Sequence, residues 1–313
     1  MLSFIPLIAL LPLLASAWKS DNHTCAALPR YYSCELSNST LKTYDTCCTP
    51  TEVLSSSTMI FADSQFWQTY TGLEKQGSVL PKESWTIHGL WPDRCDGTYG
   101  QYCDLGRQYD PRPSPNTTTG LPNGTIVPVW KGGDIVTPLL KKVARYDLLA
   151  FINKYWKNRD YEDYDLWQHE FSKHATCFST FDVGNNGTNN CYGSEVVNAT
   201  ESSLVDYIEA VVASELQYPT YTWLKNAGIT PSNTTSYNLT AFESTLTKAS
   251  GALPYVGCSG PTRQTLSELW YYTHTLGRPQ EAIFKPVNVS TPKSNCNTTA
   301  PIWYYTRSNG SEA

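Results

Sequence analysis

Residues 167–177 read WQHEFSKHATC, and residues 85–93 read WTIHGLWPD. Of the five histidines in the 313-residue chain, three lie in these two stretches, together with one glutamate and one lysine. Most of the remaining residues in both stretches are apolar or aromatic. Histidine is the side chain that gives and accepts protons near neutral pH. The two stretches therefore predict acid–base chemistry and a fold that brings them together.

The longer stretch has the spacing of a helix face, because residues four apart lie one turn above another. His169 would lie over Lys173, and Glu170 over His174. The zinc protease motif HExxH has its histidines four apart, whereas these two are five apart, with a lysine before the second. A cation in the middle of a metal site opposes zinc binding. The arrangement suits a phosphorus-centred transition state, whose negative charge a lysine and an imidazolium stabilise.

Both stretches resemble the active-site segments of the ribonuclease T2 family, secreted acid endoribonucleases of the fungal type. WTIHGLWPD matches that family without a gap, and HEFSKHATC departs from its usual KHG by carrying Ala175. Weaker similarity runs from about Cys25 to about Val289. The resemblance implies a secreted endoribonuclease that cleaves single-stranded RNA to a 2′,3′-cyclic phosphate and then to a 3′-phosphate. It also implies low base specificity, an acid pH optimum, and no cofactor or metal.

The resemblance further implies roles for five residues. His174 is expected to be the general base and His88 the general acid, although the two roles could be exchanged. Lys173 and Glu170 are expected to stabilise the transition state, Glu170 by hydrogen bonding or by orienting His174. His169 is expected to hold the phosphate or the 2′-hydroxyl. Without the motif, a lone histidine on a strand is more often structural, and the helical residues could form a salt-bridge face.

A base pocket is implied at Trp91, Asp93 and Tyr99. An aromatic ring can stack on any base, and a carboxylate accepts a hydrogen bond from the exocyclic amine of a purine. The alternatives are core aromatics at Trp91 and Tyr99 and a turn cap at Asp93. The match to the family continues through residues 95–99, CDGTY, which favours the pocket.

The N-terminus predicts export. Residues 1–17 contain an apolar run followed by Ala15-Ser16-Ala17, the A-x-A pattern of a signal peptidase site. No later stretch has the roughly 18 apolar residues of a membrane span. We therefore expect a secreted chain, with a vacuolar or lysosome-like compartment as the alternative, and no membrane contact. Eleven N-x-[ST] sequons predict N-linked glycans, and we expect a monomer.

The ten cysteines are an even set, which in an oxidising compartment indicates five disulfides. Sequence alone gives no connectivity. Two of the pairs implied by the family resemblance would tether the active-site stretches. The implied pairs are Cys25 with Cys48, Cys34 with Cys95, Cys47 with Cys191, Cys103 with Cys177, and Cys258 with Cys296.

The formal net charge is −5 at pH 7 with neutral histidines, which is unusual for a protein that handles a polyanion. If all five histidines became charged in acid, the formal charge would rise to zero. We therefore expect acid-favoured activity and weak, salt-sensitive binding of long RNA.

The pattern along the chain predicts an α+β fold, a single domain with a central, mainly antiparallel sheet, flanking helices and disulfide staples. The Pro-rich residues 104–133 are expected to form a surface loop, because the catalytic stretches on either side must meet. The domain is expected to span residues 18–292, and the sequence does not decide whether residues 293–313 join it. The last helix is expected to be capped by Thr240 or Asn238. Strands are expected at 84–90, 266–274 and 282–289, a strand followed by a turn within 50–76, and helices at 136–156, 201–217 and 238–249.

Two other functional classes remain open. One is a secreted storage or interaction protein that has kept this fold and lost activity. The usual cause would be the loss of a catalytic histidine, whereas His88 and His174 are both present. The other is a zinc-dependent hydrolase that uses His169, Glu170 and His174, which the spacing opposes. An RNA-cleavage assay with and without EDTA separates all three classes.

Overall fold

The computed structural model describes Cys25 and residues 31–35, 45–54, 57–185, 190–193, 198–290 and 292–313. The predicted signal peptide lies outside this part of the chain. The strands are β1 (Met59–Phe66), β2 (Thr86–Arg94), β3 (Tyr255–Ser259), β4 (Thr265–Leu276) and β5 (Ile283–Val287). The α-helices are α2 (Val136–Lys142), α3 (Tyr146–Tyr155), α4 (Asp163–Lys173), α5 (Ala199–Glu215), α6 (Thr220–Asn226) and α7 (Leu239–Ser250). Short 3-10 helices are η1 (Glu74–Gln76), η2 (Leu105–Arg107), η3 (Ala175–Cys177), η4 (Ser179–Phe181) and η5 (Pro279–Glu281).

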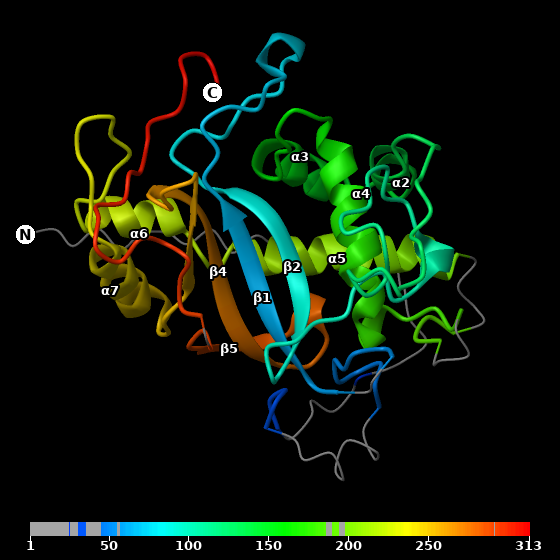
Figure 1. Cartoon of the computed structure of the whole chain (residues 1–313). Helices are drawn as coiled ribbons and strands as arrows, with labels where there is room; N and C mark the ends of the chain where they lie inside the picture. The colour runs from blue at the N-terminus through cyan, green and yellow to red at the C-terminus, as the bar shows by residue number, and fades with distance from the viewer. Residues whose placement is uncertain are drawn as a thin grey trace, which may run out of the picture.

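The five strands form one antiparallel sheet (Figure 1). Strands β2, β1, β4 and β3 lie side by side in that order, and β5 pairs with the second half of β4. Burial alternates along most of β4, as expected for a strand with one face in the core. Helix α5 crosses behind the sheet in Figure 1, and its apolar residues pack against β1 and β2. The predicted α+β class with a mainly antiparallel sheet is confirmed.

Two large hydrophobic clusters form the core. The larger packs α2, α3, α4 and α5 against β1 and β2, with Phe61 and Ile87 buried at its centre. The second packs α6 and α7 against β3 and β4. The C-terminal segment 292–313 joins this second cluster through Ile302 and Tyr304, which are fully buried. The packed body therefore includes the segment whose place the sequence left open.

The prediction of one helix over residues 136–156 is wrong, because α2 and α3 are separate. Ala144, between them, has a left-handed backbone with φ of 57°, which a continuous helix does not allow. The next residue, Arg145, forms an ion pair with Glu209 of α5. The break lets both short helices turn their apolar sides into the larger cluster.

The remaining predicted elements are present with shifted ends. Asn238, one of the two expected caps, begins α7, and its side chain accepts a hydrogen bond from the backbone N–H of Ala241 at 2.8 Å. The sequence pattern does not predict α6 or β3. Both are short, with seven and five residues, and so few residues show little periodicity.

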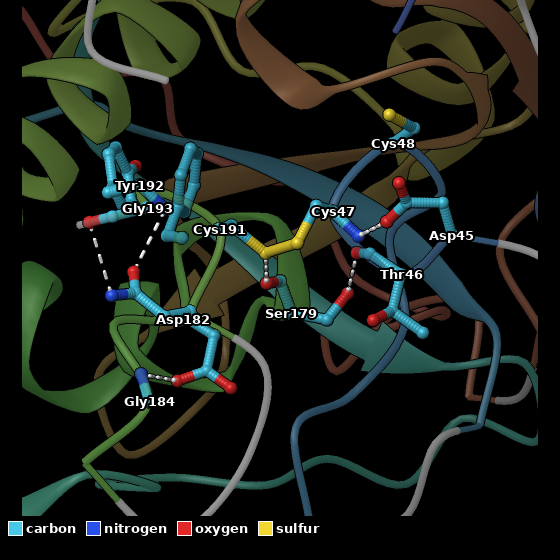
Figure 2. The surroundings of a disulfide bond; sticks show 12 residues. Asp45, Thr46, Cys47, Cys48, Ser179, Asp182, Gly184, Cys191, Tyr192 and Gly193 are labelled. Atoms are coloured by element: carbon cyan, nitrogen blue, oxygen red, sulfur yellow. Dashed lines mark hydrogen bonds between the residues drawn. A yellow bond between two sulfur atoms is a disulfide. The ribbon is translucent and has the colours of Figure 1, made fainter. Parts of the chain in front are cut away.

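One of the five disulfides ties the N-terminal segment to the region after α4. Figure 2 shows Cys47 bonded to Cys191, with Ser179 of η4 beside the bridge. Ser179 Oγ donates to the carbonyl of Thr46 at 2.7 Å, and the Cys47 N–H donates to Asp45 Oδ1 at 2.9 Å. The pairs are those that the family resemblance implies: Cys25 with Cys48, Cys34 with Cys95, Cys47 with Cys191, Cys103 with Cys177, and Cys258 with Cys296.

Candidate active site

A β-bulge in β2 positions His88. The pairing of β2 with β1 shifts between Ser64 and Gln65, so that His88 is the extra residue on β2. Ile87 lies in the larger hydrophobic cluster. Side chains three positions apart on a regular strand point to opposite faces, yet the His88 and Trp91 rings lie 4.8 Å apart. The bulge, which the sequence does not predict, therefore brings both rings to one site.

Helix α4 carries the other catalytic candidates in its last turns and ends at Lys173. The predicted helical arrangement is present up to Lys173, and the His174 N–H still donates to the Glu170 carbonyl at 3.0 Å. The chain then tightens into η3, whose residues are all buried. Ala175 is fully buried, and its methyl group belongs to the larger hydrophobic cluster. The site geometry thus accommodates alanine at this position.

Glu170 is the centre of the site. Its side chain is fully buried, and Oε2 accepts a hydrogen bond from Trp91 Nε1 at 2.8 Å. The Nε2 atoms of three imidazoles surround it. His88 lies 3.5 Å and His169 4.0 Å from Oε1, and His174 lies 3.9 Å from Oε2. Since Oε1 has no hydrogen-bond partner among the described residues, this oxygen can take a proton or bind a substrate hydroxyl.

The close approach of β2 to α4 depends on Gly89. A Cβ at this position would lie 2.0 Å from Glu170 Oε2 and 3.1 Å from Trp91 Nε1. Any other side chain would displace the central carboxyl. The sequence carries this residue inside the HGLWP motif, but the reason for a glycine is visible only when the strand and the helix are seen together.

The charge of the central carboxyl reflects burial and its basic neighbours. Burial raises the pKa of Glu170 to about 7, while the charges of His169 and Lys173 and the Trp91 hydrogen bond act to lower it. Burial lowers the pKa of Lys173, and the carboxylates of Glu170 and Asp110 partly offset this. Glu170 can therefore exchange a proton near neutral pH.

His174 is buried, and His88 is half-buried between aromatic rings. The His88 ring stacks on Phe66 with 3.8 Å between ring centres, and its Nδ1 lies 3.2 Å from Ser64 Oγ. The His174 ring stacks on Trp91 at 5.1 Å. Burial lowers the pKa of both imidazoles well below the usual value, and nearby positive charges add to this effect. Each imidazole is therefore neutral at pH 7 and gains a proton only in acid.

His169 is oriented by an aspartate that the sequence motifs do not reveal. Asp110 Oδ2 lies 2.6 Å from His169 Nδ1 and accepts a hydrogen bond from the Tyr102 hydroxyl at 2.8 Å. Burial tends to raise the pKa of Asp110, but hydrogen bonds from His169, the Arg112 N–H and Tyr102 hold it below its usual range. Asp110 lies in the Pro-rich loop 104–133, and the only available sequence signal is that this loop separates the two catalytic stretches.

Two of the three candidate base-pocket residues lie at the far end of β2. Asp93 and Tyr99 face each other across a turn through an isolated backbone bridge. Tyr99 is 59% exposed, whereas Asp93 is half-buried and burial raises its pKa to about 7. An open aromatic ring beside a carboxyl that can carry a proton is compatible with recognition of a base.

Trp91 belongs to the catalytic cluster as much as to a base pocket. Its indole N–H donates a hydrogen bond to Glu170. Its ring stacks on His174 and packs edge-on against the Trp270 ring, with 5.2 Å between the Trp91 and Trp270 ring centres. Trp270 is itself stacked on Tyr255 at 4.1 Å. The prediction of a pure stacking role for Trp91 therefore leaves out its contact with the central carboxyl.

A buried glutamate anchors the turn of the base pocket. Arg94 donates from Nε to Glu52 at 2.8 Å, pairs with the same carboxylate through a second nitrogen, and donates from Nη1 to Thr98 at 3.0 Å. The backbone of Glu52 also bridges to Phe178, which follows the catalytic segment. The turn between Asp93 and Tyr99 and the end of the catalytic segment are thus fixed to the same residue.

Within the described ranges, no group of three or more His, Cys, Asp or Glu side chains is arranged to hold a metal ion. In the same part of the chain, no helix is long and apolar enough to cross a membrane.

Comparison with known proteins identifies the family of this chain. The model of the ribonuclease T2 family matches residues 58–298. This chain belongs to the ribonuclease T2 family. It is 34% identical to Ribonuclease Trv of Hypocrea rufa over 252 residues, which are 80% of this chain and 87% of that protein. It is 29% identical to Ribonuclease T2 of Aspergillus oryzae over 295 residues, covering 90% of this chain and 89% of that protein.

Members of the family differ in length, and one solved structure covers nearly all of this chain. The chain spans 48% of a Ribonuclease T2-like protein of Aspergillus fumigatus, to which it is 34% identical over 236 residues. The crystal structure of Actibind, described as a T2 ribonuclease, superposes with a TM-score of 0.66 at 29% identity, covering 92% of this chain and 99% of that one. The protein is a T2-type endoribonuclease, as the sequence resemblance implies.

Proposed function

We propose that this T2 ribonuclease cleaves single-stranded RNA by transphosphorylation to a 2′,3′-cyclic phosphate, which it then hydrolyses to a 3′-phosphate. The observation that carries the proposal is the convergence of three imidazole Nε2 atoms within 4.0 Å of the Glu170 carboxyl. RNA carries its own nucleophile, the 2′-hydroxyl. The protein then needs a base, an acid and groups that stabilise the charge of the phosphorane.

In the first stage, His174 removes the proton of the 2′-hydroxyl while the 2′-oxygen forms a bond to phosphorus. The bond from phosphorus to the 5′-oxygen breaks, and protonated His88 gives its proton to that oxygen. In the second stage His88 removes a proton from a water molecule, whose oxygen forms a bond to phosphorus. The bond from phosphorus to the 2′-oxygen breaks, and protonated His174 gives its proton to that oxygen, which leaves the 3′-phosphate. Because both Nε2 atoms face the same carboxyl, the geometry serves the opposite assignment of base and acid equally well.

The remaining residues stabilise and orient. Lys173 stabilises the negative charge of the equatorial phosphate oxygens in the transition state. His169 is oriented by Asp110 and holds the phosphate or the 2′-hydroxyl. Glu170 lies between the imidazoles, where it stabilises an imidazolium as it forms or donates a hydrogen bond when protonated. Glu170 Oε2 lies 3.9 Å from His174 Nε2, which supports an interaction between the carboxylate and the protonated imidazole.

An acid pH optimum follows from the burial of the two histidines. One imidazole must be neutral while the other is charged, so activity has a bell-shaped pH profile. Because burial lowers the pKa of both His88 and His174, the charged form appears only at acid pH. The loss of net negative charge in acid acts in the same direction by reducing repulsion of RNA.

Base selection is proposed at Trp91, Asp93 and Tyr99, without strict sequence specificity. Since the pKa of Asp93 is raised to about 7, its carboxyl is protonated in acid and offers both a donor and an acceptor. Adenine offers the complementary pair, a ring nitrogen and an exocyclic amine. The base ranking of Asp93→Asn on dinucleotides that differ at the 5′ base tests this role, and an unchanged ranking would assign Asp93 to the turn.

The proposed setting is extracellular or vacuolar, with N-linked glycans and a monomeric enzyme. Five disulfides support an oxidising compartment. The charge of −5 is compatible with work at acid pH. Size-exclusion chromatography with and without glycosidase treatment of the secreted protein tests both expectations.

The decisive experiment uses an oligonucleotide with one 2′-deoxy sugar at the scissile position. We expect cleavage of the all-ribose control, with or without EDTA, and none of the deoxy substrate, because the nucleophile is missing. His88→Ala and His174→Ala should each reduce kcat by about 10²- to 10⁴-fold with an unchanged melting temperature. Cleavage at the deoxy position, or a fully active histidine variant, would overturn the mechanism.

A further inference from the structure

A cavity of about 210 Å³ lies outside the catalytic site. It is enclosed by the segment that leads into β2, the end of α3, and the connection from α5 to α6. None of the catalytic candidates lines it. The lining residues are Glu83, Ser84, Trp85, Phe151, Tyr155, Glu215, Leu216, Tyr218, Pro219, Thr220, Tyr221 and Thr222.

The wall of the cavity is rich in aromatic side chains. Five of its residues are Trp, Tyr or Phe, and aromatic rings attract cations through the negative charge of their faces. The protein already places ammonium groups over two of these rings. Lys154 Nζ lies 4.9 Å from the centre of the Tyr155 ring, and Lys225 Nζ lies 5.8 Å from that of Tyr221.

One carboxyl in this wall lacks a positive partner. Glu215 is the last residue of α5, and its Oε2 accepts a hydrogen bond from Gln65 Nε2 at 3.1 Å. Behind it lies Asp63 of β1, which is 4% exposed and whose Oδ1 has no hydrogen-bond partner in the described chain. No lysine, arginine or histidine among the described residues forms an ion pair with either carboxyl.

A buried acidic side chain beside a second, partly buried one is costly unless protonated or matched by a cation. Burial and the nearby Asp63 raise the pKa of Glu215, and burial raises that of Asp63. The C-terminal end of the 17-residue helix α5 adds its own partial negative charge at Glu215. The two carboxyls therefore tend to hold protons in the absence of a cation, and a bound cation would favour their ionised form. A carboxyl without a basic partner in the described chain, the aromatic wall and the available volume coincide at one place.

We propose that this cavity binds a small organic ammonium ion, with its nitrogen against Glu215 and its alkyl part against the aromatic rings. A hydrated divalent metal is disfavoured, because such ions take several oxygen ligands whereas this wall is largely aromatic. Phosphate groups of RNA are disfavoured because the described residues of the wall offer them no free cation: Lys225 is paired with Glu83 at 2.7 Å.

Isothermal titration calorimetry of the intact secreted protein tests the proposal, with putrescine and tetramethylammonium as probes and 1,4-butanediol as the uncharged control. We expect one cation bound per chain and at least about tenfold weaker binding of the diol. Glu215→Gln, which keeps the shape and the Gln65 contact, should weaken cation binding at least about tenfold. Tyr155→Leu should weaken it as well.

Glu243→Gln on α7 is the matched control for a general loss of negative charge, and it should bind as the unmodified protein does. The melting temperature of each variant shows that it is folded. Equal binding of the diol, or unchanged binding in folded Glu215→Gln, overturns the proposal. So does stoichiometric binding of Mg²⁺ that is lost in Glu215→Gln, since that result would identify a metal site.

Discussion

At the residue scale, the position of the Glu170 carboxyl depends on one hydrogen bond and on a glycine that has no side chain. Trp91 Nε1 fixes Glu170 Oε2 at 2.8 Å, and Gly89 leaves the space into which that oxygen projects. The Trp91 ring is fixed in turn by His174 and Trp270. Small changes at these positions should therefore alter catalysis before they alter the fold.

Gly89→Ala should reduce kcat at least about 100-fold, because the new methyl group displaces Glu170 and a misplacement of about 1 Å can cost that much. Steady-state kinetics on RNA measures the effect. Gly257→Ala on β3 is the matched control for a steric clash elsewhere in the sheet, because its new Cβ would lie 2.3 Å from Glu268 Cγ. If Gly89→Ala kept normal kcat with a normal melting temperature, the required close approach of β2 and α4 would be disproved.

Trp91→Phe should reduce kcat by about 10- to 100-fold while the ranking of the four bases stays the same. The ring that could stack on a base remains, whereas the hydrogen bond to Glu170 is lost, and such bonds to charged groups contribute about 1.5 to 3 kcal/mol. Dinucleotide kinetics separates the two roles. Trp303→Phe, in the C-terminal segment and stacked on Tyr305, is the control. A changed base ranking with normal kcat would assign Trp91 to base binding alone.

At the scale of elements, the site is built where one strand, one helix and one loop meet. The bulge of β2 supplies His88, the last turn of α4 supplies Glu170 and Lys173, and the loop 104–133 supplies Asp110. The disulfide between Cys103 and Cys177 joins the start of this loop to η3. The loop is therefore a component of the site, although no catalytic motif lies in it.

Asp110→Asn should lower kcat/KM by about 10-fold, because His169 loses a charged partner at 2.6 Å while the side-chain shape is kept. The double variant Asp110→Asn with His169→Ala should be no worse than His169→Ala alone, since the aspartate acts through the histidine. Kinetics of the three proteins measures this. Additive losses would show that Asp110 acts on the reaction by another route.

At the scale of the whole molecule, burial sets the pH range of both activity and stability. Asp63 is nearly completely buried on β1, and burial raises its pKa from 3.8 to about 7. The folded state therefore holds this proton more tightly than the unfolded chain. Its contribution to the free energy of unfolding is fully present below about pH 4 and is lost as the pH rises through about 7.

Asp63→Asn should consequently gain stability relative to the unmodified protein as the pH rises from 4 to 8. The relative gain should reach a few kcal/mol, with about 4 as the upper limit, because each pKa unit corresponds to about 1.4 kcal/mol. Chemical denaturation at pH 4, 6 and 8 measures it. Comparing the two proteins at each pH removes the opposite contribution of the buried histidines, and a constant difference across this range would contradict the raised pKa.

The sequence by itself determined the family, the fold class and the chemical types at the site. These follow from short-range information, because WTIHGLWPD and HEFSKHATC each carry demanding residues at fixed spacing. The helices of 17 and 12 residues were predictable because they are long enough to show a period of 3.6. The break at Ala144 was not predictable, because local propensity alone favours a continuous helix. An ion pair between Arg145 and α5 accompanies the break.

Only the tertiary structure decided how the candidates meet. The bulge that turns His88 toward Trp91 is defined by the register of β1, and a sequence has no register until its partner strand is known. Asp110 and Glu52 act across 59 and 42 residues of chain on His169 and Arg94. The pKa values of Glu170, His88 and His174 depend on burial by elements that are remote in sequence. Pairing, long-range contact and desolvation are properties of the assembled molecule, so they cannot be read from the local pattern.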